Sequence, residues 1–512
     1  MPIEEWLTRS EVLPGAPGVR SAVVPLDQWR SAALDIATAS GRLAALWASR
    51  DEHMGSCIHA AFLLKRVALV LSSRWADPDS AYPGIEDLFP AAARMQRATA
   101  DLCGVYSTGA DTRPWLRHAA WPQTYRPLID PPLAASAAAP SIDSYGFVRV
   151  EGDGVHEIAV GPVHAGTIEP GHFRFSVVGE KVLRLEERLG YTHKGIEQRF
   201  AELPILEGHR LAARVSGDSA VAFSWAYCQA LEGISDVQIP PRAAWLRALY
   251  LEMERVANHL GDLGALGNDA GFAFGLMQFS RLKEQLLRAS EELLGARYLM
   301  EAVVPGGTRL DLTAADAREL SRCVREVANQ ALVLRSIYDE HEGVRDRFNG
   351  AGRVSAELAK RLGLTGLAGR ASGQAFDLRT DLPCDPYAQI APLKMGQGAG
   401  DVAARVAVRF DELQESCRLI EEIVSALPGG AHSSEVGSPP EGALGIGLIE
   451  GWRGAVLVAL EAGSGGRIRR CHPHDPSWQN WPVLEHAIIE NIVPDFPLIN
   501  KSFNLSYSGH DL

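Results

Sequence analysis

The chain has 512 residues, of which 46% are hydrophobic and 22% are charged, an ordinary composition for globular domains. Its formal net charge of −13 argues against nucleic acid as a partner, because binding to phosphates needs a basic surface. No run of about eighteen apolar residues is present, so we expect no membrane span and infer that membrane association comes through partner proteins. This length gives room for two or three domains with a substantial core.

The seven cysteines are scattered along the chain, and no two of them have C-x-x-C spacing. The acidic start, M-P-I-E-E-W-L, lacks the basic and apolar parts of a signal peptide. This combination indicates reduced thiols rather than a disulfide framework. The chain alone offers no cysteine cage for zinc or an iron–sulfur cluster, so we expect it to bind no cofactor by itself.

Residues 1–130 are predicted to form a small α/β unit. Apolar residues have helical spacing over 26–47, and the composition of 61–73 is typical of a strand. A helix is predicted over 90–104, because it starts at a proline and ends at a glycine. Residues 131–141 contain P-P-L-A-A-S-A-A-A-P, which is poor in charge and bounded by prolines, and we interpret them as a linker.

Residues 142–512 are predicted to begin with strands and to continue as a helix bundle. Alternation of apolar and polar residues predicts strands at 147–150, 157–160 and 172–178, and the pattern becomes helical from about Arg188. Long helices are predicted at 240–260, 276–294, 314–341 and 401–427. Strands return at 455–461 and 466–471, before a short apolar helix and the tail. The fold class predicted for the whole chain is α+β.

Titratable residues gather among glycines between Gly161 and Gly233. The stretch contains G-P-V-H-A-G-T-I-E-P-G-H-F-R-F (161–175), Y-T-H-K-G-I-E (191–197) and R-V-S-G-D-S (214–219). Glycines beside such groups let a backbone or a ligand come close, so this mixture predicts a functional site. We expect His164 and His172 to face a cavity and Glu169 to relay protons; the alternatives are bonds from the histidines to the backbone and a turn role for Glu169.

These motifs, with A-Y-x-x-A-L-E-G-I, L-E-M-E-R-V-A-N-H-L and the C-terminal tail, resemble the large subunit of formate hydrogenlyase and hydrogenase-4. That family is homologous to the D-type subunit of respiratory complex I, which forms the quinone pocket. The first unit resembles the C-type subunit of complex I through Y-P-G-I-E-D-L-F-P-A-A-A-R-M-Q-R-A-T-A-D-L-C-G-V (82–105) and the later Y-R-P-L. The resemblance implies a C-type α/β domain at 1–130, a linker at 131–141, and at 142–512 a D-type helix-bundle domain with flanking antiparallel sheets.

The chain departs from this family at each position that would hold nickel and iron. The family motifs R-x-C-G-x-C and D-P-C-x-x-C read here R-V-S-G-D-S and N-L-S-Y-S-G, so the four cysteine positions are Ser216, Ser219, Ser506 and Gly509. Serine hydroxyls are poor ligands for soft metals, and glycine has no side chain. We expect these serines to bond to the backbone, and we expect no metal site and no hydrogenase activity.

The complex I side of the resemblance implies a quinone headgroup held by a histidine of the 161–175 loop and by a tyrosine. Asp218 lies near the place of that tyrosine; it either replaces the tyrosine or is a neutral, hydrogen-bonded substitution for a cysteine. Lys194, next to His193, falls where a modified arginine lies near the partner's iron–sulfur cluster, and a cation there stabilises the reduced cluster. Arg214 and Arg453 are expected to approach the same cavity.

The implied role is that of the large peripheral-arm subunit of a membrane-bound electron-transport complex. Such complexes are NADH dehydrogenase-like, NAD-binding assemblies or hydrogenase-4-like ones, at the cytoplasmic face of the inner membrane. The expected partners are a small protein like the B-type subunit of complex I, with a 4Fe–4S cluster against residues 191–197, a ferredoxin-like iron–sulfur subunit and antiporter-like membrane subunits. In the favoured mechanism a quinone enters the former metal cavity, and His164, Glu169, His172 and Asp218 handle protons. The alternative is a non-catalytic scaffold with a closed cavity.

Two further clusters are interpreted as structural. The run C-H-P-H-D at 471–475 resembles a metal-binding sequence, but it lies at a predicted strand end, where alternation directs the side chains apart. Glu252, Glu254, Arg255 and His259 are interpreted as the charged faces of one helix, with i,i+3 pairs.

Overall fold

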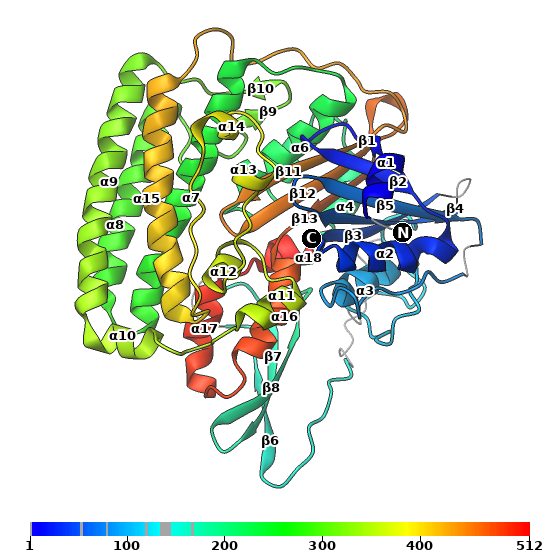
Figure 1. Cartoon of the computed structure of the whole chain (residues 1–512), viewed down its shortest axis with the longest axis horizontal. Helices are drawn as coiled ribbons and strands as arrows, with labels where there is room; N and C mark the ends of the chain where they lie inside the picture. The colour runs from blue at the N-terminus through cyan, green and yellow to red at the C-terminus, as the bar shows by residue number, and fades with distance from the viewer. Residues whose placement is uncertain (1–2, 52–54, 78–79, 118–120, 134–144, 165–167) are drawn as a thin grey trace.

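The computed structural model describes residues 3–51, 55–77, 80–117, 121–133, 145–164 and 168–512. Figure 1 shows an N-terminal sheet unit beside a larger body in which long helices stand side by side and three C-terminal strands face the first unit. Helices and small, mostly antiparallel sheets alternate in the larger body, so the predicted α+β class is confirmed. The predicted linker falls mainly on 134–144, outside the described residues.

The N-terminal unit is a five-stranded sheet with the order β1-β2-β5-β4-β3, in which only β2 and β5 are parallel neighbours. Its helix α3 packs against β3 and ends at Gly104, which adopts a left-handed φ of 63°. The elements are α1 (Ile3–Arg9), β1 (Glu11–Val12), β2 (Val19–Val23), α2 (Trp29–Thr38), β3 (Arg42–Asp51), β4 (Gly55–Leu63), β5 (Ala68–Trp75) and α3 (Ala92–Cys103).

The helix predicted over 90–104 is confirmed as α3, whereas two other predictions for this unit are wrong. The helical pattern over 26–47 covers α2 and then the first part of β3, because the apolar run L-A-A-L-W suits a buried strand as well as a helix. The single strand predicted at 61–73 is the end of β4, a turn and most of β5.

The larger unit begins with a three-stranded antiparallel sheet that projects from the body (Figure 1). Its strands are β6 (Val155–Val160), β7 (His172–Val178) and β8 (Lys181–Arg188). β6 and β7 confirm two predicted strands. The strand predicted at 147–150 is wrong, because those residues pair with no neighbouring strand, and β8 was not predicted.

Four long helices form a bundle, and all four are predicted by the sequence. They are α7 (Pro241–Asp269), α8 (Ala273–Leu294), α9 (Ala314–Glu340) and α15 (Val402–Ala426), and neighbours pack along their lengths. Local signals set their starts: α7 has a proline in its first turn, and the side chains of Thr313 and Asp401 accept backbone hydrogen bonds at the N-termini of α9 and α15.

Helix α6 (Ala220–Ile234) lies between the bundle and a C-terminal antiparallel sheet of order β11-β12-β13. The approach of α6 to β11 requires a glycine at 447, where a Cβ would lie 1.8 Å from the Ala226 carbonyl oxygen. The sheet comprises β11 (Leu444–Gly451), β12 (Gly454–Ala462) and β13 (Ile468–His474), and β12 and β13 pack against β3, so one hydrophobic core runs through both units.

The remaining elements are short and connect these layers. They are α4 (Ile196–Ala201), α5 (Gly208–Ala212), β9 (Val303–Val304), β10 (Gly307–Thr308), α10 (Glu342–Phe348), α11 (Ala356–Leu362), α12 (Gly366–Ala371), α13 (Leu378–Asp381), α14 (Tyr387–Ile390), α16 (Ser477–Ala487), α17 (Phe496–Phe503) and α18 (Tyr507–Asp511). Within the described ranges, no helix has both the length and the apolar composition needed to cross a bilayer.

Candidate functional site

Arg453 and Asp218 form the centre of the candidate site. Arg453 lies in the turn between β11 and β12, and Asp218 lies in the turn before α6. The guanidinium donates two hydrogen bonds to the carboxylate, from Nη1 to Oδ1 at 2.6 Å and from Nη2 to Oδ2 at 2.5 Å. Trp452 Nε1 also donates to the Asp218 carbonyl oxygen, at 2.9 Å. Two parallel bonds fix the orientation of the pair as well as its distance.

The positions that lack the family's cysteines lie around this ion pair. Ser216 Oγ donates to Asp218 Oδ1 at 2.8 Å and lies 2.8 Å from Ser506 Oγ, although 290 residues separate the two serines. Ser506 Oγ also accepts a hydrogen bond from the Gly509 backbone N–H at 2.9 Å, as the N-cap of α18. These two hydroxyl groups therefore close the site through hydrogen bonds.

A nickel–iron centre does not fit these residues. Arg453 Nη1 lies 3.4 Å from Ser219 Oγ, so a cation already stands beside the serine positions, and Gly509 offers no side-chain ligand. Among the residues that the structure describes, no three histidine, cysteine or carboxylate side chains are grouped so that they could hold a metal ion. The chemistry available here is that of an ion pair and its hydroxyl groups.

Burial and charge act in opposite directions on the acids of this centre. Burial raises the pKa of Asp218, but the charge and hydrogen bonds of Arg453 outweigh it, and the net pKa is lowered. Asp218 is therefore ionised at neutral pH. Asp475 differs, because burial dominates and raises its pKa. Its Oδ2 would lie 2.6 Å from a Cβ at position 509, so this carboxyl group fills the space of the fourth cysteine.

A pocket opens beside Asp218, between α7 and α8. Its volume is about 560 Å³ including the mouth, and Asp218, Glu254 and Asn258 form its polar inner wall. Leucines of α8 form the apolar side, and Tyr298, which is 57% exposed, stands among the residues of the rim. Asp218 keeps 40% of its side chain accessible, whereas Arg453 keeps 5%. The ion pair is thus closed on the arginine side and open on the aspartate side.

The 161–175 loop is held by its own polar groups. His164 Nε2 lies 2.8 Å from the Gly171 carbonyl oxygen, and His172 Nδ1 lies 3.2 Å from that of Gly161. Glu169 Oε2 accepts a hydrogen bond from the Ser508 backbone N–H at 3.2 Å, which joins the loop to the C-terminal tail. Residues 165–167 lie outside the described part. The bonds of the two histidines to the backbone agree with the structural alternative, and their cavity role stays a prediction.

The segment 191–197 lies against the same tail and against the Ser216 turn. Lys194 Nζ donates to the Val215 carbonyl oxygen at 2.9 Å, and His193 Nδ1 lies 2.7 Å from the Asp511 carbonyl oxygen. Burial lowers the pKa of Lys194, while the charges of Glu169 and Asp511 act to raise it. This segment therefore connects directly to the turn that carries Asp218.

Arg214 does not join the ion pair. Its guanidinium donates to Glu301 Oε1 at 2.5 Å, and its side chain is 48% exposed. Of the two arginines expected at the cavity, the structure brings only Arg453 to Asp218.

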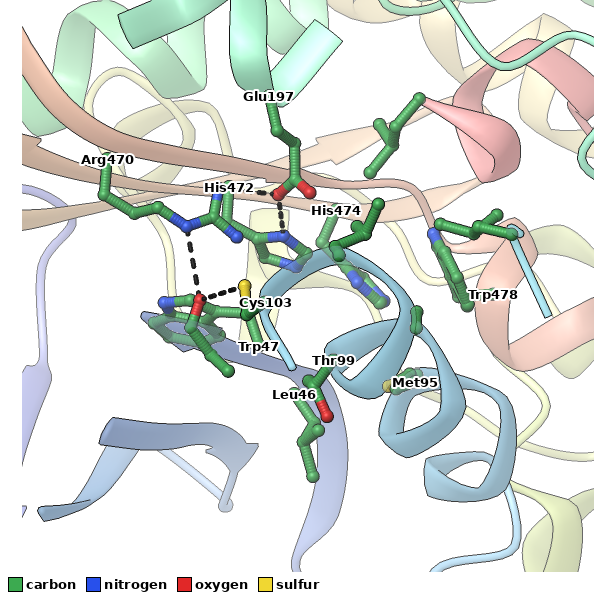
Figure 2. Close-up of a pocket in the computed structure, with 15 residues that line it drawn as sticks. Leu46, Trp47, Met95, Thr99, Cys103, Glu197, Arg470, His472, His474 and Trp478 are labelled. Carbon is green, nitrogen blue, oxygen red and sulfur yellow. Dashed lines mark hydrogen bonds and ion pairs between the residues drawn. The ribbon is translucent and has the colours of Figure 1, made fainter. Parts of the chain in front are cut away.

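A second buried cluster joins α4 to β13 and the N-terminal unit. Figure 2 shows Glu197 above Arg470 and His472, with Cys103 and Trp47 below them. Glu197 Oε1 accepts from His472 Nδ1 at 2.6 Å and from Arg470 Nη1 at 2.8 Å. Burial raises the pKa of Glu197, but the positive charge of Arg470 outweighs it and lowers the pKa to about 2. His472 is thus a partner of Glu197 within the strand β13.

The interpretation of Glu252, Glu254, Arg255 and His259 as charged helix faces is wrong, since all four side chains are buried. The predicted i,i+3 pair is present between Arg255 and Glu252, at 3.3 Å. Sequence reasoning also missed Asp475 as a neighbour of the centre. The available signal was the density of charged residues on all sides of α7, which a helix exposed on one face does not need.

The fold and the site together define the large subunit of a complex I-like or hydrogenase-like membrane complex. The family described as Respiratory-chain NADH dehydrogenase, 49 Kd subunit, matches residues 269–442. Formate hydrogenlyase subunit 5 of Escherichia coli (strain K12) is 31% identical over 84% of this chain and 77% of the relative. Hydrogenase-4 component G of the same organism is 30% identical over 85% of this chain and 77% of the relative.

A solved structure gives the same fold. A chain of the membrane-bound sulfane sulfur reductase, an archaeal respiratory membrane complex, superposes with a TM-score of 0.66 at 24% identity, over 70% of this chain and 98% of that chain. The protein belongs to the family of formate hydrogenlyase subunit 5 and hydrogenase-4 component G, which is related to the fused C/D subunits of NADH-quinone oxidoreductase. Within that family, this chain has serine or glycine at the nickel–iron ligand positions.

Proposed function

We propose that the protein receives electrons from a 4Fe–4S cluster on a small partner, like the B-type subunit of complex I, and delivers them to a quinone bound beside Asp218. The observation that carries this proposal is the position of Asp218. Its carboxylate takes part in the ion pair that occupies the former metal position, and it also lines an open pocket with an apolar wall. A pocket with one apolar wall and a few polar groups suits a flat, amphipathic headgroup.

The partner's cluster is proposed to lie against residues 191–197. This segment bonds to the Ser216 turn through Lys194, so the cluster and the acceptor would be separated by one layer of protein. Val163, Ile168 and Tyr191 flank the tail residues to which Glu169 and Lys194 are bonded, and their side chains are exposed. Exposed apolar groups around a cation favour a protein partner over water at this face.

The carboxylates Glu169 and Asp218 are the proton-carrying groups of this proposal. Asp218 is ionised beside Arg453 and can accept a proton, and Glu169 connects the loop to the tail next to Lys194. His164 and His172 each use one ring nitrogen to shape the loop, and an imidazole can exchange a proton at its second nitrogen.

The remaining partners follow from the relatives. A ferredoxin-like iron–sulfur subunit would supply electrons, and antiporter-like subunits would anchor the complex at the cytoplasmic face of the inner membrane. The names of the relatives, formate hydrogenlyase, hydrogenase-4 and NADH-quinone oxidoreductase, describe multi-subunit electron-transfer systems and support this arrangement.

A scaffold that only holds its partners is the second candidate. The observation that favours it is the closed metal position, where Ser216, Ser506 and Arg453 leave their polar groups bonded to one another. The two candidates differ in one respect, because only the first needs the pocket beside Asp218 to take up a ligand.

Photo-crosslinking separates the two functions. An azido-quinone would be irradiated with the native complex extracted from membranes, and labelled peptides would be mapped by mass spectrometry. Labelling within 214–227, 253–258 or 283–299, suppressed by excess unmodified quinone, is the expected result. An intact complex that carries no suppressible label would contradict the quinone proposal and support the scaffold.

A further inference from the structure

Glu254 is a buried carboxyl group to which the proposed function gives no role so far. It lies on α7, and the residue is 9% exposed. Its Oε2 accepts a hydrogen bond from the Val221 backbone N–H at 2.8 Å, and its Oε1 accepts one from Ala222 at 3.3 Å. Both donors belong to the first turn of the fifteen-residue helix α6, where free N–H groups and the helix dipole stabilise an anion. The carboxylate form of Glu254 therefore has a place prepared for it.

The pocket beside Asp218 gives Glu254 a route to water. Glu254 and Asp218 both line the inner wall, and Asn258 lies between them. Asn258 Nδ2 donates to the backbone carbonyl oxygens of Asp218 and Glu254, at 2.8 and 2.9 Å, and so fixes the spacing of the two acids. Lys283 and Tyr298 line the same pocket, and Tyr298 is largely exposed, so the rim reaches solvent.

The charged groups around Glu254 come from four segments. Asp218 approaches from the turn before α6, Lys283 from α8, and Arg297 and Tyr298 from the chain after α8. Arg255 is on α7 itself, but its guanidinium donates to the carbonyl oxygens of the β11 end, away from the pocket. Arg297 is paired with Glu284.

The protonated form of Glu254 is favoured by this environment. Burial raises the pKa of its carboxyl group most, and the negative charge of Asp218 raises it further, whereas the two α6 N–H groups lower it; the net pKa is about 8. An acid with a pKa near the working pH can both give and take up a proton.

We propose that Glu254 is the acid that delivers protons to an acceptor bound in the α7–α8 pocket and that it is reprotonated by water entering at Lys283 and Tyr298. The proposal rests on the proposed function. Reduction of a quinone to a quinol takes two electrons, here from the reduced iron–sulfur cluster of the partner, and two protons. For each proton, the O–H bond of the Glu254 carboxyl breaks, a new O–H bond forms on the quinone oxygen, and the carboxylate stays bonded to Val221 and Ala222 until water returns a proton.

The test compares Glu254→Gln and Glu254→Asp with Glu291→Gln, an exposed control on α8. Reduction of a soluble quinone analogue by the membrane-extracted complex would be followed against pH. We expect the wild-type rate to fall above pH ~8, Glu254→Gln to be about a hundredfold slower at pH 7 without that break, and Glu254→Asp to recover the break. The KM for the quinone should change little, because the isosteric amide leaves the pocket's shape intact. An unchanged rate and pH profile in Glu254→Gln would overturn the proposal.

Infrared titration of the same complex tests Glu254 without turnover. A protonated-carboxyl C=O band that bleaches around pH ~8 in the wild type and the Glu291→Gln control, and is missing in Glu254→Gln, is the expected result. If that band is present and no quinone is reduced, Glu254 is a proton-exchanging acid and the quinone assignment fails. If quinone is reduced and no such band exists, the role of Glu254 is overturned while the proposed function stands.

Discussion

The guanidinium of Arg453 holds the carboxylate of Asp218 through two hydrogen bonds, of 2.6 and 2.5 Å, between the positions at which relatives of this chain would bind a metal. One side chain comes from a β-turn and the other from the start of a helix 235 residues earlier. The pair is the structural reason that four substitutions of ligand cysteines leave a closed, ordered centre.

Removing the charge of Asp218 should destabilise the protein. In Asp218→Asn the guanidinium of Arg453 stays buried without its counter-ion, and we expect the free energy of unfolding to fall by about 2 kcal/mol. Glu301→Gln removes the partner of the exposed Arg214 and should change it by less than about 0.5 kcal/mol. Urea unfolding of the purified chain measures both. Equal losses in the two variants would contradict the importance of the buried pair.

A side chain at position 509 should not fit. A Cβ there would lie 2.6 Å from Asp475 Oδ2 and 2.8 Å from Ser506 Oγ, so we expect Gly509→Ala to lose about 2 kcal/mol of stability. Gly217→Ala is the matched control, because nothing lies within 4 Å of its added Cβ. Thermal unfolding should show a lower Tm for Gly509→Ala alone. A stability of Gly509→Ala like that of the wild type would mean that Asp475 does not occupy the space of the missing ligand.

Glu197 should stabilise the protein at neutral pH and lose this effect in acid. Its pKa is about 2 in the folded protein and 4.5 in the unfolded chain, so its contribution is complete above pH ~4.5 and declines as the pH falls toward 2. We expect Glu197→Gln to be less stable by about 3 kcal/mol at pH 7, with a gap that narrows below pH ~4.5.

Glu284 is the control for that experiment, because its pKa is also about 2 but its ion pair with Arg297 is exposed to solvent. Solvent screens such a pair, so Glu284→Gln should change stability little at any pH. Denaturation series at several pH values would decide the comparison. A Glu197→Gln gap that stays constant down to pH ~3 would show that the packing of the side chain matters rather than its charge.

Glu254 should act in the opposite sense. Its folded pKa of about 8 lies above the unfolded value of 4.5, so unfolding releases a proton between these pH values and its contribution to stability falls as the pH rises through that window. Relative to Glu254→Gln, the wild type should lose up to about 4 kcal/mol between pH ~4.5 and ~8. Calorimetric Tm values of both proteins across this range measure the difference, and a difference that does not vary with pH would contradict the raised pKa.

Long-range regularities of the sequence predict the bundle well. Proline at the start of α7, capping residues before α9 and α15, and sustained helical spacing are local signals that tertiary packing does not override. The alanine-rich start of β3 fits both a helix and a buried strand, and only its pairing with β4 decides between them. This is why the N-terminal unit was predicted less well.

The site shows the same division. Asp218 was singled out because it stands within a degenerate ligand motif, and its partner Arg453 was expected from the family. The direction of the Arg214 side chain depends on Glu301, and the burial of Glu254 depends on how α8 covers α7, and neither relation has a local signal in the sequence.

The most direct test of this account combines metal analysis with cluster reoxidation on one membrane-extracted complex. The partner's 4Fe–4S cluster would be reduced, and its EPR signal followed after addition of quinone under argon, with nickel and evolved hydrogen measured in the same sample. The account predicts loss of the reduced-cluster signal on adding quinone, slowed in Asp218→Asn, with nickel far below one atom per complex and no hydrogen. Stoichiometric nickel with hydrogen evolution, or a cluster that quinone does not reoxidise, would contradict it.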